Sequence, residues 1–339
     1  MNLVDHEIRI SGSDIVFRSA SGDNLLRAGL RAGIGFPYEC NVGACGSCKV
    51  EVIEGETLDL WPQAPGLSAK DRAKGRRLAC QCRPLTSCEI KIRPSDDFVP
   101  VIRPHRFVAV LVARRPVTHD IYEFSFRSND GSKFLPGQYL LMDVPNGDQV
   151  RAYSMSNLSN ADGLWNVMVR RVVNGKMSNW LFDSLKIADS INIDGPYGLA
   201  YFRSDISRDV VCIAGGSGFA PMLSIANSVS IDPSMTGRAV SFFYGGRTAV
   251  DIPTFSQWLI RPESVECYPA VSTPEKDDQS DWHGERGFVH ELVSRKLTGD
   301  LCDREYYLAG PPPMIEVMVR TLMLEHKVPA SQIHFDRFF

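Results

Sequence analysis

Three closely spaced cysteines constrain this chain more than any other feature of its sequence. Cys40, Cys45 and Cys48 have the spacing C-x4-C-x2-C, which together with a distant fourth cysteine is the spacing of a plant-type [2Fe–2S] cluster. The residues between them are small, so the loop can wrap closely and direct backbone N–H groups at sulfur. By spacing alone, the fourth ligand is either Cys80 or Cys82.

Two other interpretations of this loop have less support. Structural zinc sites favour two C-x2-C pairs, and this sequence has one. Inert buried cysteines are the second alternative, but three cysteines among glycines make poor core material. The cysteines elsewhere are expected to act as small hydrophobic residues: Cys88, Cys212, Cys267 and Cys302.

Composition limits the class of protein. The cysteine count is odd, at nine, and no signal peptide is recognised, so we expect a cytoplasmic protein without a disulfide framework. A formal net charge of −3 with dispersed basic residues predicts no nucleic-acid partner. No stretch approaches the roughly 18 consecutive apolar residues of a membrane span, so we expect no membrane partner either.

The 339 residues suggest two or three domains, and their patterns divide into three segments. Residues 1–97 read as a small α+β module with a helix at 24–32. Its expected strands are 7–10, 15–18, 49–53 and 89–92. Prolines interrupt residues 94–104, where we expect no helix and place the first domain boundary.

The other two segments differ in their patterns of apolar residues and turns. Residues 104–204 contain short strands separated by turns, which predicts an antiparallel barrel. Its expected strands are 108–113, 121–126, 139–144, 166–173 and 190–193, with a short helix near 178–184. In residues 205–339 apolar runs alternate with helical patterns, which predicts a parallel α/β sheet. Its expected strands are 210–214, 239–244 and 306–308, with helices after Pro221 and over 254–259.

Three short motifs in the barrel segment suit a flavin nucleotide. Arg151, Tyr153 and Ser154 follow an expected turn at 145–147 and offer a phosphate ligand, an aromatic face and a hydroxyl. Residues 175–178 open the expected helix, whose free N–H groups can receive a pyrophosphate, although Ser178 can equally be a plain N-cap. Residues 195–198, Gly-Pro-Tyr-Gly, are expected to form a tight turn. Each motif alone also has an ordinary structural explanation, but their order is informative.

A glycine-rich segment follows the first strand of the α/β part. Gly215, Gly216 and Gly218 permit close backbone approach to a phosphate, and Pro221 suits a first helical turn. The strict dinucleotide fingerprint has a third glycine where Pro221 stands, and no acidic residue follows the next strand. We therefore expect a phosphate-binding loop, but not an ordinary Rossmann site. A second strand-end turn, residues 310–314, lies on the edge where α/β sheets bind ligands.

Taken together, these motifs resemble the reductase component of bacterial multicomponent oxygenases over nearly the whole chain. That family joins a plant-type ferredoxin domain to a ferredoxin–NADP reductase-like module. The stretches at 36–40, 78–82 and 334–339 look closest to reductases of toluene and alkene monooxygenases. The resemblance implies a β-grasp-like [2Fe–2S] domain at 1–97, a six-stranded antiparallel FAD-binding barrel at 104–204 and an α/β NAD(P)H-binding domain at 205–339.

The resemblance also assigns roles to residues. It selects Cys80 over Cys82 as the fourth cluster ligand, FAD over FMN, and Phe339 as a cover for the flavin ring. Tyr153, Ser154 and Phe339 are the residues expected to act at the flavin ring. The residues expected to bind FAD or NADH are Arg151, Tyr153, Ser154, Val169, Gly175, Lys176, Met177, Ser178, Gly215, Gly216, Ser217, Gly218, Pro221, Arg247, Gly310, Pro311, Met314 and Phe339.

The chain departs from its apparent relatives at one position and leaves one choice open. Many relatives have a cysteine where this sequence has Ala309, so no thiol is available there in hydride transfer. Arg247 can bind a 2′-phosphate and favour NADPH, or pair with the pyrophosphate of either cofactor. The resemblance favours NADH.

The implied function is an electron relay. Nicotinamide releases two electrons as hydride and an iron–sulfur cluster accepts one, so a flavin must lie between them. The expected acceptor is a Rieske-type ferredoxin or the oxygenase of a di-iron monooxygenase, served by a monomeric reductase. The alternatives are the reductase of a ring-hydroxylating dioxygenase and, more remotely, an iron–sulfur redox sensor without turnover. A basic stretch near Cys80 can meet an acidic partner or be a solvated helix face: Lys70, Arg72, Lys74, Arg76 and Arg77.

Overall fold

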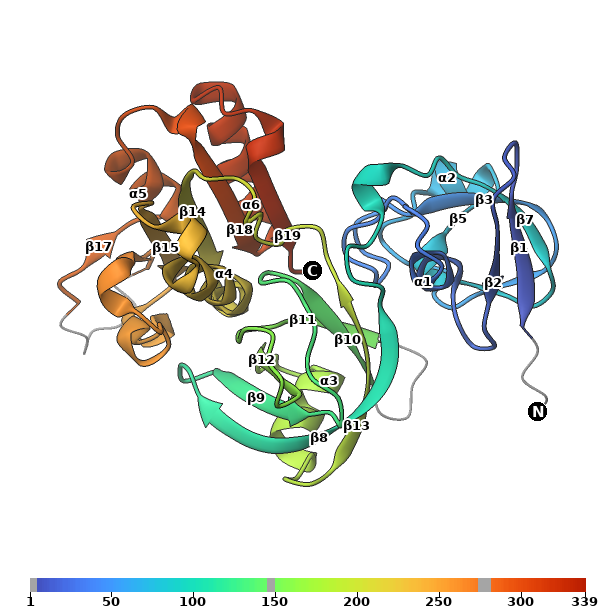
Figure 1. The fold of residues 1–339 in the computed structure, drawn as a ribbon, viewed down its shortest axis with the longest axis horizontal. Helices are drawn as coiled ribbons and strands as arrows, with labels where there is room; N and C mark the ends of the chain where they lie inside the picture. The colour runs from blue at the N-terminus through green and yellow to red at the C-terminus, as the bar shows by residue number, and fades with distance from the viewer. Residues whose placement is uncertain (1–4, 145–149, 274–281) are drawn as a thin grey trace. The chain divides into compact units, whose positions relative to one another are not determined.

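The computed structural model describes residues 5–144, 150–273 and 282–339 (Figure 1). The chain forms two compact units. The first unit comprises Met1–Phe107, Leu141–Ala152 and Asn192–Tyr197. The second comprises Val108–Leu140, Tyr153–Ile191 and Gly198–Phe339. The turn expected at 145–147 lies outside the described residues.

The N-terminal part is a mixed sheet with the order β2-β1-β7-β3-β5. Its strands are β1 (His6–Ile10), β2 (Val16–Ser19), β3 (Lys49–Glu54), β5 (Arg76–Leu78) and β7 (Cys88–Lys91). β1 pairs with β7 in parallel and with β2 antiparallel, as in a β-grasp sheet. A two-stranded ribbon of β4 (Thr57–Asp59) and β6 (Cys82–Pro84) and the short helix α2 (Ala69–Ala73) complete this part.

Helix α1, Leu25–Arg31, is the main helix beside this sheet. It begins where the side chain of Asn24 accepts a hydrogen bond from the backbone N–H of Arg27, and asparagine is a favoured N-cap. Its completely buried apolar side chains are Leu25, Leu26 and Leu30. The chain then leaves the helix through Gly33, whose φ of 82° suits glycine.

The middle segment forms a six-stranded sheet with the order β11-β10-β13-β8-β9-β12. The strands are β8 (His105–Pro116), β9 (Ile121–Arg127), β10 (Tyr139–Asp143), β11 (Val150–Ser154), β12 (Leu164–Arg170) and β13 (Ser190–Tyr197). β9 pairs antiparallel with both β8 and β12. Helix α3 (Lys176–Asn179) continues into a π-helical turn, Trp180–Ser184.

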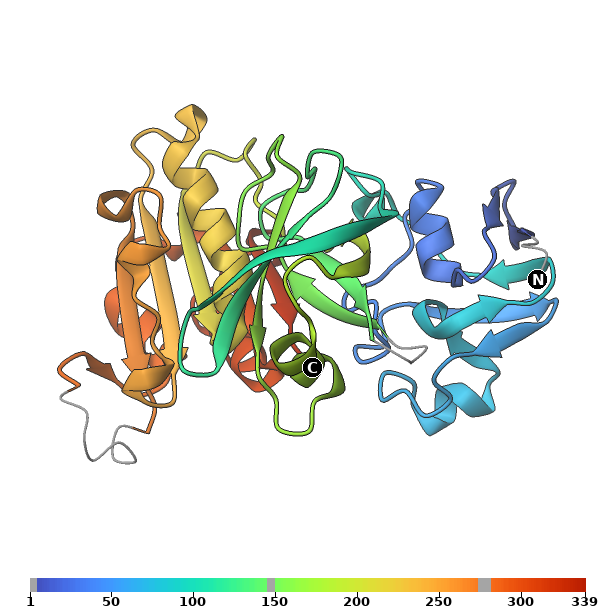
Figure 2. The ribbon, with the colours of Figure 1, turned by 90° about the horizontal axis from the view of Figure 1, so that it is seen from below.

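The C-terminal part is a parallel sheet with the order β17-β16-β15-β14-β18-β19. The strands are β14 (Asp209–Gly215), β15 (Val240–Gly246), β16 (Glu266–Val271), β17 (Glu285–Arg286), β18 (Arg304–Gly310) and β19 (Ile333–Arg337). Figure 2 shows helix α4 (Phe219–Ile231), in yellow, lying along these strands. Helices α5 (Val289–Lys296) and α6 (Pro312–Arg320) pack in a different cluster.

The central strand β14 explains this two-sided arrangement. Val210, Cys212 and Ala214 pack in one cluster with α4, whereas Val211 and Ile213 pack in another with α5 and α6. Successive side chains of a strand point to opposite faces, so an unbroken apolar run places helices on both faces. The predicted fold class, with an antiparallel barrel and a parallel α/β sheet, is confirmed.

Several local predictions were wrong. Gly195–Tyr197 was expected in a turn, but it belongs to the end of β13. The helix expected at 254–259 is only a 3-10 turn, Phe255–Gln257. The side chain of Asn227 on α4 bonds the carbonyl of Trp258 and the N–H of Ile260, so these groups are not used in a helix. No α-helix forms in 94–104, as expected; the segment contains a single 3-10 turn, Asp96–Phe98, capped by the side chain of Ser95.

Strand β11 carries the Arg-x-Tyr-Ser motif, and it lacked a recognisable pattern in the sequence. Strands β16, β17 and β19 of the parallel sheet were also missed. In the part of the chain that the structure describes, none of the helices combines the length and apolar character needed to cross a membrane.

Candidate functional site

The cysteine loop is shaped by backbone donors that point at sulfur. The Sγ atom of Cys40 accepts hydrogen bonds from the backbone N–H groups of Ala44 and Cys45, each at 3.3 Å. The Sγ atom of Cys45 accepts one from the N–H of Ser47 at 3.4 Å. Such donors stabilise negative charge on sulfur, as a thiolate bound to a metal requires.

Glycines let the loop close on itself. Gly43 and Gly46 have φ values of 92° and 80°, in the left-handed region that favours glycine. A Cβ atom at Gly46 would overlap the carbonyl oxygen of Gly66. The small residues are therefore required by the local fold, as well as suited to a ligand.

The predicted cluster ligands lie in two contacting pairs. The side chains of Cys40 and Cys45 share a hydrogen bond, and those of Cys48 and Cys80 share another. Cys82, the competing candidate, instead contacts Thr57, and burial raises the pKa of its thiol to about 11. The structure thus brings Cys80, and not Cys82, to the other cysteines.

The thiols of the first pair have opposite tendencies. The hydrogen bond between them, followed by burial, raises the pKa of Cys40, whereas the same bond lowers the pKa of Cys45 to about 5. Two adjacent sulfurs therefore compete for protons, and a bound metal would replace those protons.

The residues present fit an iron–sulfur cluster. Sulfur ligands and backbone donors are grouped in one loop, which is the donor set that such clusters use. Asn41, directly after Cys40, is 1% exposed, and its Nδ2 atom has no hydrogen-bond partner among the described residues. That amide is a spare donor next to a predicted ligand.

The predicted flavin motifs lie on three elements. On β11, Arg151 is exposed, Tyr153 is half-buried and Ser154 is buried. Val169 is a buried residue of β12. Val169 therefore belongs to the barrel core.

The start of α3 corrects one alternative. Its N-cap residue is Gly175, with no side-chain cap, so Ser178 is not the N-cap. The hydroxyl of Ser178 donates to the carbonyl of Gly175 and accepts the N–H of Val172, both at 3.2 Å. Exposed Lys176 and buried Met177 open the helix. The uncapped N–H groups and the lysine suit an anionic phosphate, so this turn fits FAD.

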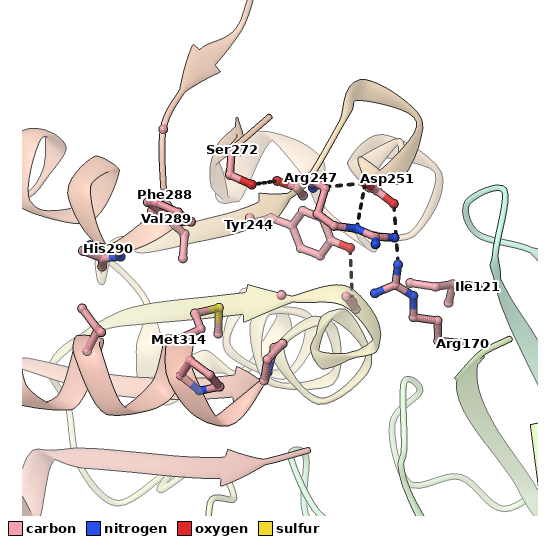
Figure 3. Close-up of a pocket in the computed structure, with 18 of the residues that line it drawn as sticks. Ile121, Arg170, Tyr244, Arg247, Asp251, Ser272, Phe288, Val289, His290 and Met314 are labelled. Atoms are coloured by element: carbon pink, nitrogen blue, oxygen red, sulfur yellow. Dashed lines mark hydrogen bonds and ion pairs between the residues drawn. The ribbon is translucent and has the colours of Figure 1, made fainter. Parts of the chain in front are cut away.

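A pocket of about 500 Å³ lies within the second unit (Figure 3). It opens where β14, β15 and β18 end, on the carboxyl edge at which α/β sheets bind ligands. The lining includes five predicted cofactor-binding residues: Gly215, Gly216, Arg247, Pro311 and Met314. Further lining residues come from β9, β12 and the start of α5 with its N-cap: Ile121, Arg170, Phe288, Val289 and His290.

The glycine-rich segment has two roles. Gly215 and Gly216 line the pocket, and the hydroxyl of Tyr244 donates to the carbonyl of Gly216 at 3.2 Å. Gly218 is not among the lining residues; a Cβ atom there would overlap the carbonyl oxygen of Ala309 on β18. Ser217, Pro221 and Gly310 are not among them either. Part of this motif is therefore required for packing between strands rather than for lining the pocket.

Charged side chains form one rim of the pocket. The guanidinium of Arg170 pairs with Asp120 at 2.6 Å and with Asp251 at 3.9 Å. Asp251 also accepts the backbone N–H groups of Arg247 and Thr248. The Arg247 side chain is 66% exposed, and its Nε atom lies 3.9 Å from Asp251. The exposed guanidinium of Arg247 suits a phosphate of a dinucleotide.

The same rim contains a group of possible metal ligands, His119, Asp120 and Asp251. Because Arg170 pairs with both carboxylates and Arg247 lies 3.9 Å from Asp251, two arginines balance the two negative charges without an ion. Sequence patterns gave no signal for Asp120, Arg170 or Asp251 as pocket residues. They reach the pocket only through the tertiary fold.

The C-terminal residue is on the surface. Phe339 is 61% exposed, and the guanidinium carbon of Arg337 lies 5.8 Å from the centre of its ring. Ala309, at the position where relatives are expected to have cysteine, is fully buried in β18.

Comparisons with known families agree with three functional segments. Residues 8–85 match the 2Fe-2S iron-sulfur cluster binding domain. Residues 108–202 match the oxidoreductase FAD-binding domain, and residues 212–320 match the oxidoreductase NAD-binding domain.

Individual proteins are similar over almost the full chain. The ferredoxin–NAD(P)(+) reductase CarAd of Metapseudomonas resinovorans is 42% identical over 94% of this chain and 95% of that protein. The ferredoxin–NAD(+) reductase component of the alkene monooxygenase system of Xanthobacter autotrophicus is 35% identical, over 95% and 97% of the two chains. A solved structure of the ferredoxin reductase in carbazole 1,9a-dioxygenase has a TM-score of 0.92 at 38% identity and covers both chains completely.

Proposed function

Because this chain belongs to the family of oxygenase-associated ferredoxin–NAD(P)+ reductases with [2Fe–2S], FAD- and NAD-binding domains, we propose that it passes electrons from NADH to a Rieske-type ferredoxin of a di-iron monooxygenase. It is an oxidoreductase, and its electron path runs through FAD and its own [2Fe–2S] cluster. The finer part of the proposal concerns the acceptor and the residues that serve each cofactor.

The proposed ligands of the cluster are Cys40, Cys45, Cys48 and Cys80. The supporting observation, which also carries the functional proposal, is that Cys40 contacts Cys45 and Cys80 contacts Cys48, beside a loop whose N–H groups point at sulfur. When bound, FAD supplies the conversion between a two-electron hydride and single electrons. No general acid or base is needed, so the protein positions the cofactors and adjusts their potentials.

Other residues are proposed to hold the two nucleotides. Arg151 would bind phosphate of FAD, Tyr153 and Ser154 would face its ring, and Gly175–Ser178 would bind its pyrophosphate at the uncapped start of α3. Gly215 and Gly216 would let NADH approach the floor of the pocket, with Arg247 at its rim. Phe339 as a cover for the flavin ring rests on the family resemblance.

An anaerobic titration with NADH, followed by visible absorbance and electron paramagnetic resonance, tests the relay. We expect the flavin bands to bleach and a rhombic reduced [2Fe–2S] signal to grow as NADH is added. Flavin reduction without any cluster signal would contradict the assignment of the cysteine loop. Slow or absent reduction by NADH would favour a redox sensor without turnover.

A dioxygenase system is the second candidate, and a specific observation favours it. One similar structure is, by its description, the ferredoxin reductase in carbazole 1,9a-dioxygenase. Reduction rates with purified ferredoxins from a di-iron monooxygenase and from a ring-hydroxylating dioxygenase separate the candidates. We expect the monooxygenase ferredoxin to be reduced faster. The opposite order would indicate that this reductase serves a ring-hydroxylating dioxygenase.

A cytoplasmic monomer is part of the same proposal. Support comes from the nine free cysteines, which suit a reducing compartment. Light scattering during gel filtration should give a mass near 37.7 kDa. A dimer mass would contradict the monomer.

A further inference from the structure

Helix α1 bears a polar edge that reaches the cysteine site. Asn24, Arg27 and Arg31 are separated by three and four residues, a spacing that places them along one side of a helix. The Nδ2 atom of Asn24 donates to the carbonyl oxygen of Cys80 at 2.9 Å. The Nε atom of Arg27 donates to Oδ1 of Asn41, the residue after Cys40, at 3.3 Å. The N-terminal part of α1 is thus bonded to both halves of the cysteine site.

The C-terminal end of α1 is bonded to strand β13. The two terminal nitrogens of Arg31 donate to the two carboxylate oxygens of Asp194, at 2.8 and 2.7 Å. One of these nitrogens also donates to the hydroxyl of Tyr197 at 3.2 Å, and that hydroxyl donates to Asp194 at 2.9 Å. A bidentate pair fixes the orientation of both partners, which a single contact does not.

A second acid and a second arginine complete this network. The Nε atom of Arg31 donates to Asp23 at 2.9 Å. Arg106 lies 3.1 Å from Asp23 and 3.7 Å from Asp194. The network therefore contains two arginines and two aspartates, and its formal charges balance.

The acids and the tyrosine of the network are buried, whereas 22% of the Arg31 side chain and 48% of the Arg106 side chain are accessible. Asp23, Asp194 and Tyr197 are 2%, 7% and 1% exposed. Burial alone would lower the pKa of Arg31 and raise that of Asp194, but their mutual hydrogen bonds shift both in the opposite direction. Burial, and then the charge of Asp194, raises the pKa of Tyr197 well above its usual value. Both ions stay charged and the phenol stays protonated.

Stability alone is a poor reason for such a network. Buried ion pairs cost desolvation, and well-packed apolar side chains can replace them without loss of stability. What a bidentate pair supplies is a fixed geometry. Here it joins the helix that holds the cysteine loop to a strand of the sheet that matches the FAD-binding domain.

We propose that Arg31, held by Asp23 and Asp194, is a positioning residue that fixes α1, and the cysteine loop bonded to it, against β13. This position in turn sets the rate of electron transfer from flavin to cluster. The proposal rests on the electron path given under Proposed function. Two electrons enter as one hydride and leave singly, and Arg31 itself exchanges neither a proton nor an electron. Its effect is on geometry alone.

The experiment compares Arg31→Gln with a matched control. Arg171→Gln removes another arginine that pairs with an aspartate at 2.7 Å, but that pair is exposed, with 49% and 51% of the two side chains accessible. Stopped-flow absorbance on the holoenzyme separates flavin reduction by NADH from the later reduction of the cluster. Hydrogen–deuterium exchange of residues 23–31 and 192–197 measures how well the backbone amides on each side of the Arg31–Asp194 contact are protected.

We expect Arg31→Gln to slow cluster reduction by about tenfold, because loss of the bidentate contact lets the cluster-bearing segment shift relative to β13, and misplacing reacting groups by about 1 Å can cost up to about a hundredfold in rate. Flavin reduction by NADH should keep its native rate, and exchange should rise at residues 192–197. Arg171→Gln should change none of these. Arg31→Lys keeps the charge but loses the bidentate geometry; it should give an intermediate rate, and it serves as the test if Arg31→Gln does not fold.

Two results would overturn the positioning role. One is a native rate of cluster reduction in an Arg31 variant that retains its iron. The other is equal slowing of flavin and cluster reduction, which would indicate general structural damage. Failure of the electron path itself would instead appear in the native protein, as the absence of a cluster signal after NADH addition.

Discussion

The cysteine loop and the pocket of the second unit are built in opposite ways. Three of the four proposed cluster ligands lie within one short loop, and the fourth follows β5 directly. The pocket instead collects side chains from strand ends of two sheets and from the start of α5 with its N-cap. A local site can be read from spacing, whereas a composite site becomes visible only when the fold brings its parts together.

The largest effect should come from the cysteine that distinguishes the local site. Cys80→Ser should abolish the [2Fe–2S] signal and cluster reduction, because Cys80 contacts Cys48. Cys82→Ser is the matched control, since Cys82 contacts Thr57 and should leave iron content unchanged. Iron analysis and electron paramagnetic resonance check both variants. Loss of the cluster in Cys82→Ser alone would reverse the assignment.

A substitution in the glycine-rich segment should test how the composite site depends on packing. Gly218→Ala would force a Cβ atom against the carbonyl oxygen of Ala309, and overpacking costs about 1–3 kcal/mol. Thermal unfolding should detect this loss, together with weaker NADH binding. Gly131→Ala is the control, because neither Gly131 nor Gly218 has a positive φ and the nearest atom to a Cβ added at Gly131 is 3.2 Å away. Equal effects would mean that the loss of a glycine, not overlap with Ala309, is responsible.

At the rim of the pocket, Arg247→Ala should raise the KM for NADH roughly tenfold with little change in kcat, since a hydrogen bond to a charged group contributes about 1.5 kcal/mol or more. The contacts of Asp251 with backbone N–H groups should survive, because they do not use the arginine side chain. Steady-state reduction of ferricyanide measures both parameters. A change confined to NADPH would show that Arg247 recognises a 2′-phosphate instead.

The same contrast explains what the sequence could predict. The apolar run at 210–214 and the C-x4-C-x2-C spacing predict a buried parallel strand and a metal loop, because both signals are local. Spacing left Cys80 and Cys82 open, and the family resemblance selected Cys80. The contact of Cys80 with Cys48 and the presence of Arg170 in the pocket depend on the fold. Gly218 looked like a ligand residue in the sequence, but its neighbour is the backbone of β18. Domain boundaries and cofactor contacts stay predictions.

The ion-pair network on α1 makes the first unit sensitive to acid. The pKa of Asp194 is lower in the folded protein than in the unfolded chain, so its stabilising contribution is complete above the unfolded value of about 4. That contribution is lost as the pH falls through the lower folded pKa. Thermal unfolding of native protein and Asp194→Asn should therefore differ at pH 7 and converge in acid. A constant difference would mean that the carboxylate charge does not contribute.

The smallest effect is expected at the basic stretch near Cys80. Some of its side chains bond to other residues of the same unit, and others are exposed. Arg72 donates to the carbonyl of Ala64 and Arg76 pairs with Asp71 at 2.8 Å, whereas Lys70 and Lys74 are exposed. The exposed lysines are thus better probes of docking than the arginines, whose loss would also disturb the local fold.

Charge reversal by Lys74→Glu should slow electron transfer to an acidic ferredoxin roughly twofold to fivefold at low salt, because exposed ion pairs contribute about 0.2–1 kcal/mol. The effect should fade as salt is added, since such charges steer the encounter between proteins. Lys91→Glu is the matched control, because it reverses an exposed lysine of β7 in the same unit. If both variants slow transfer equally, the effect reflects net charge and the stretch near Cys80 has no special part in docking.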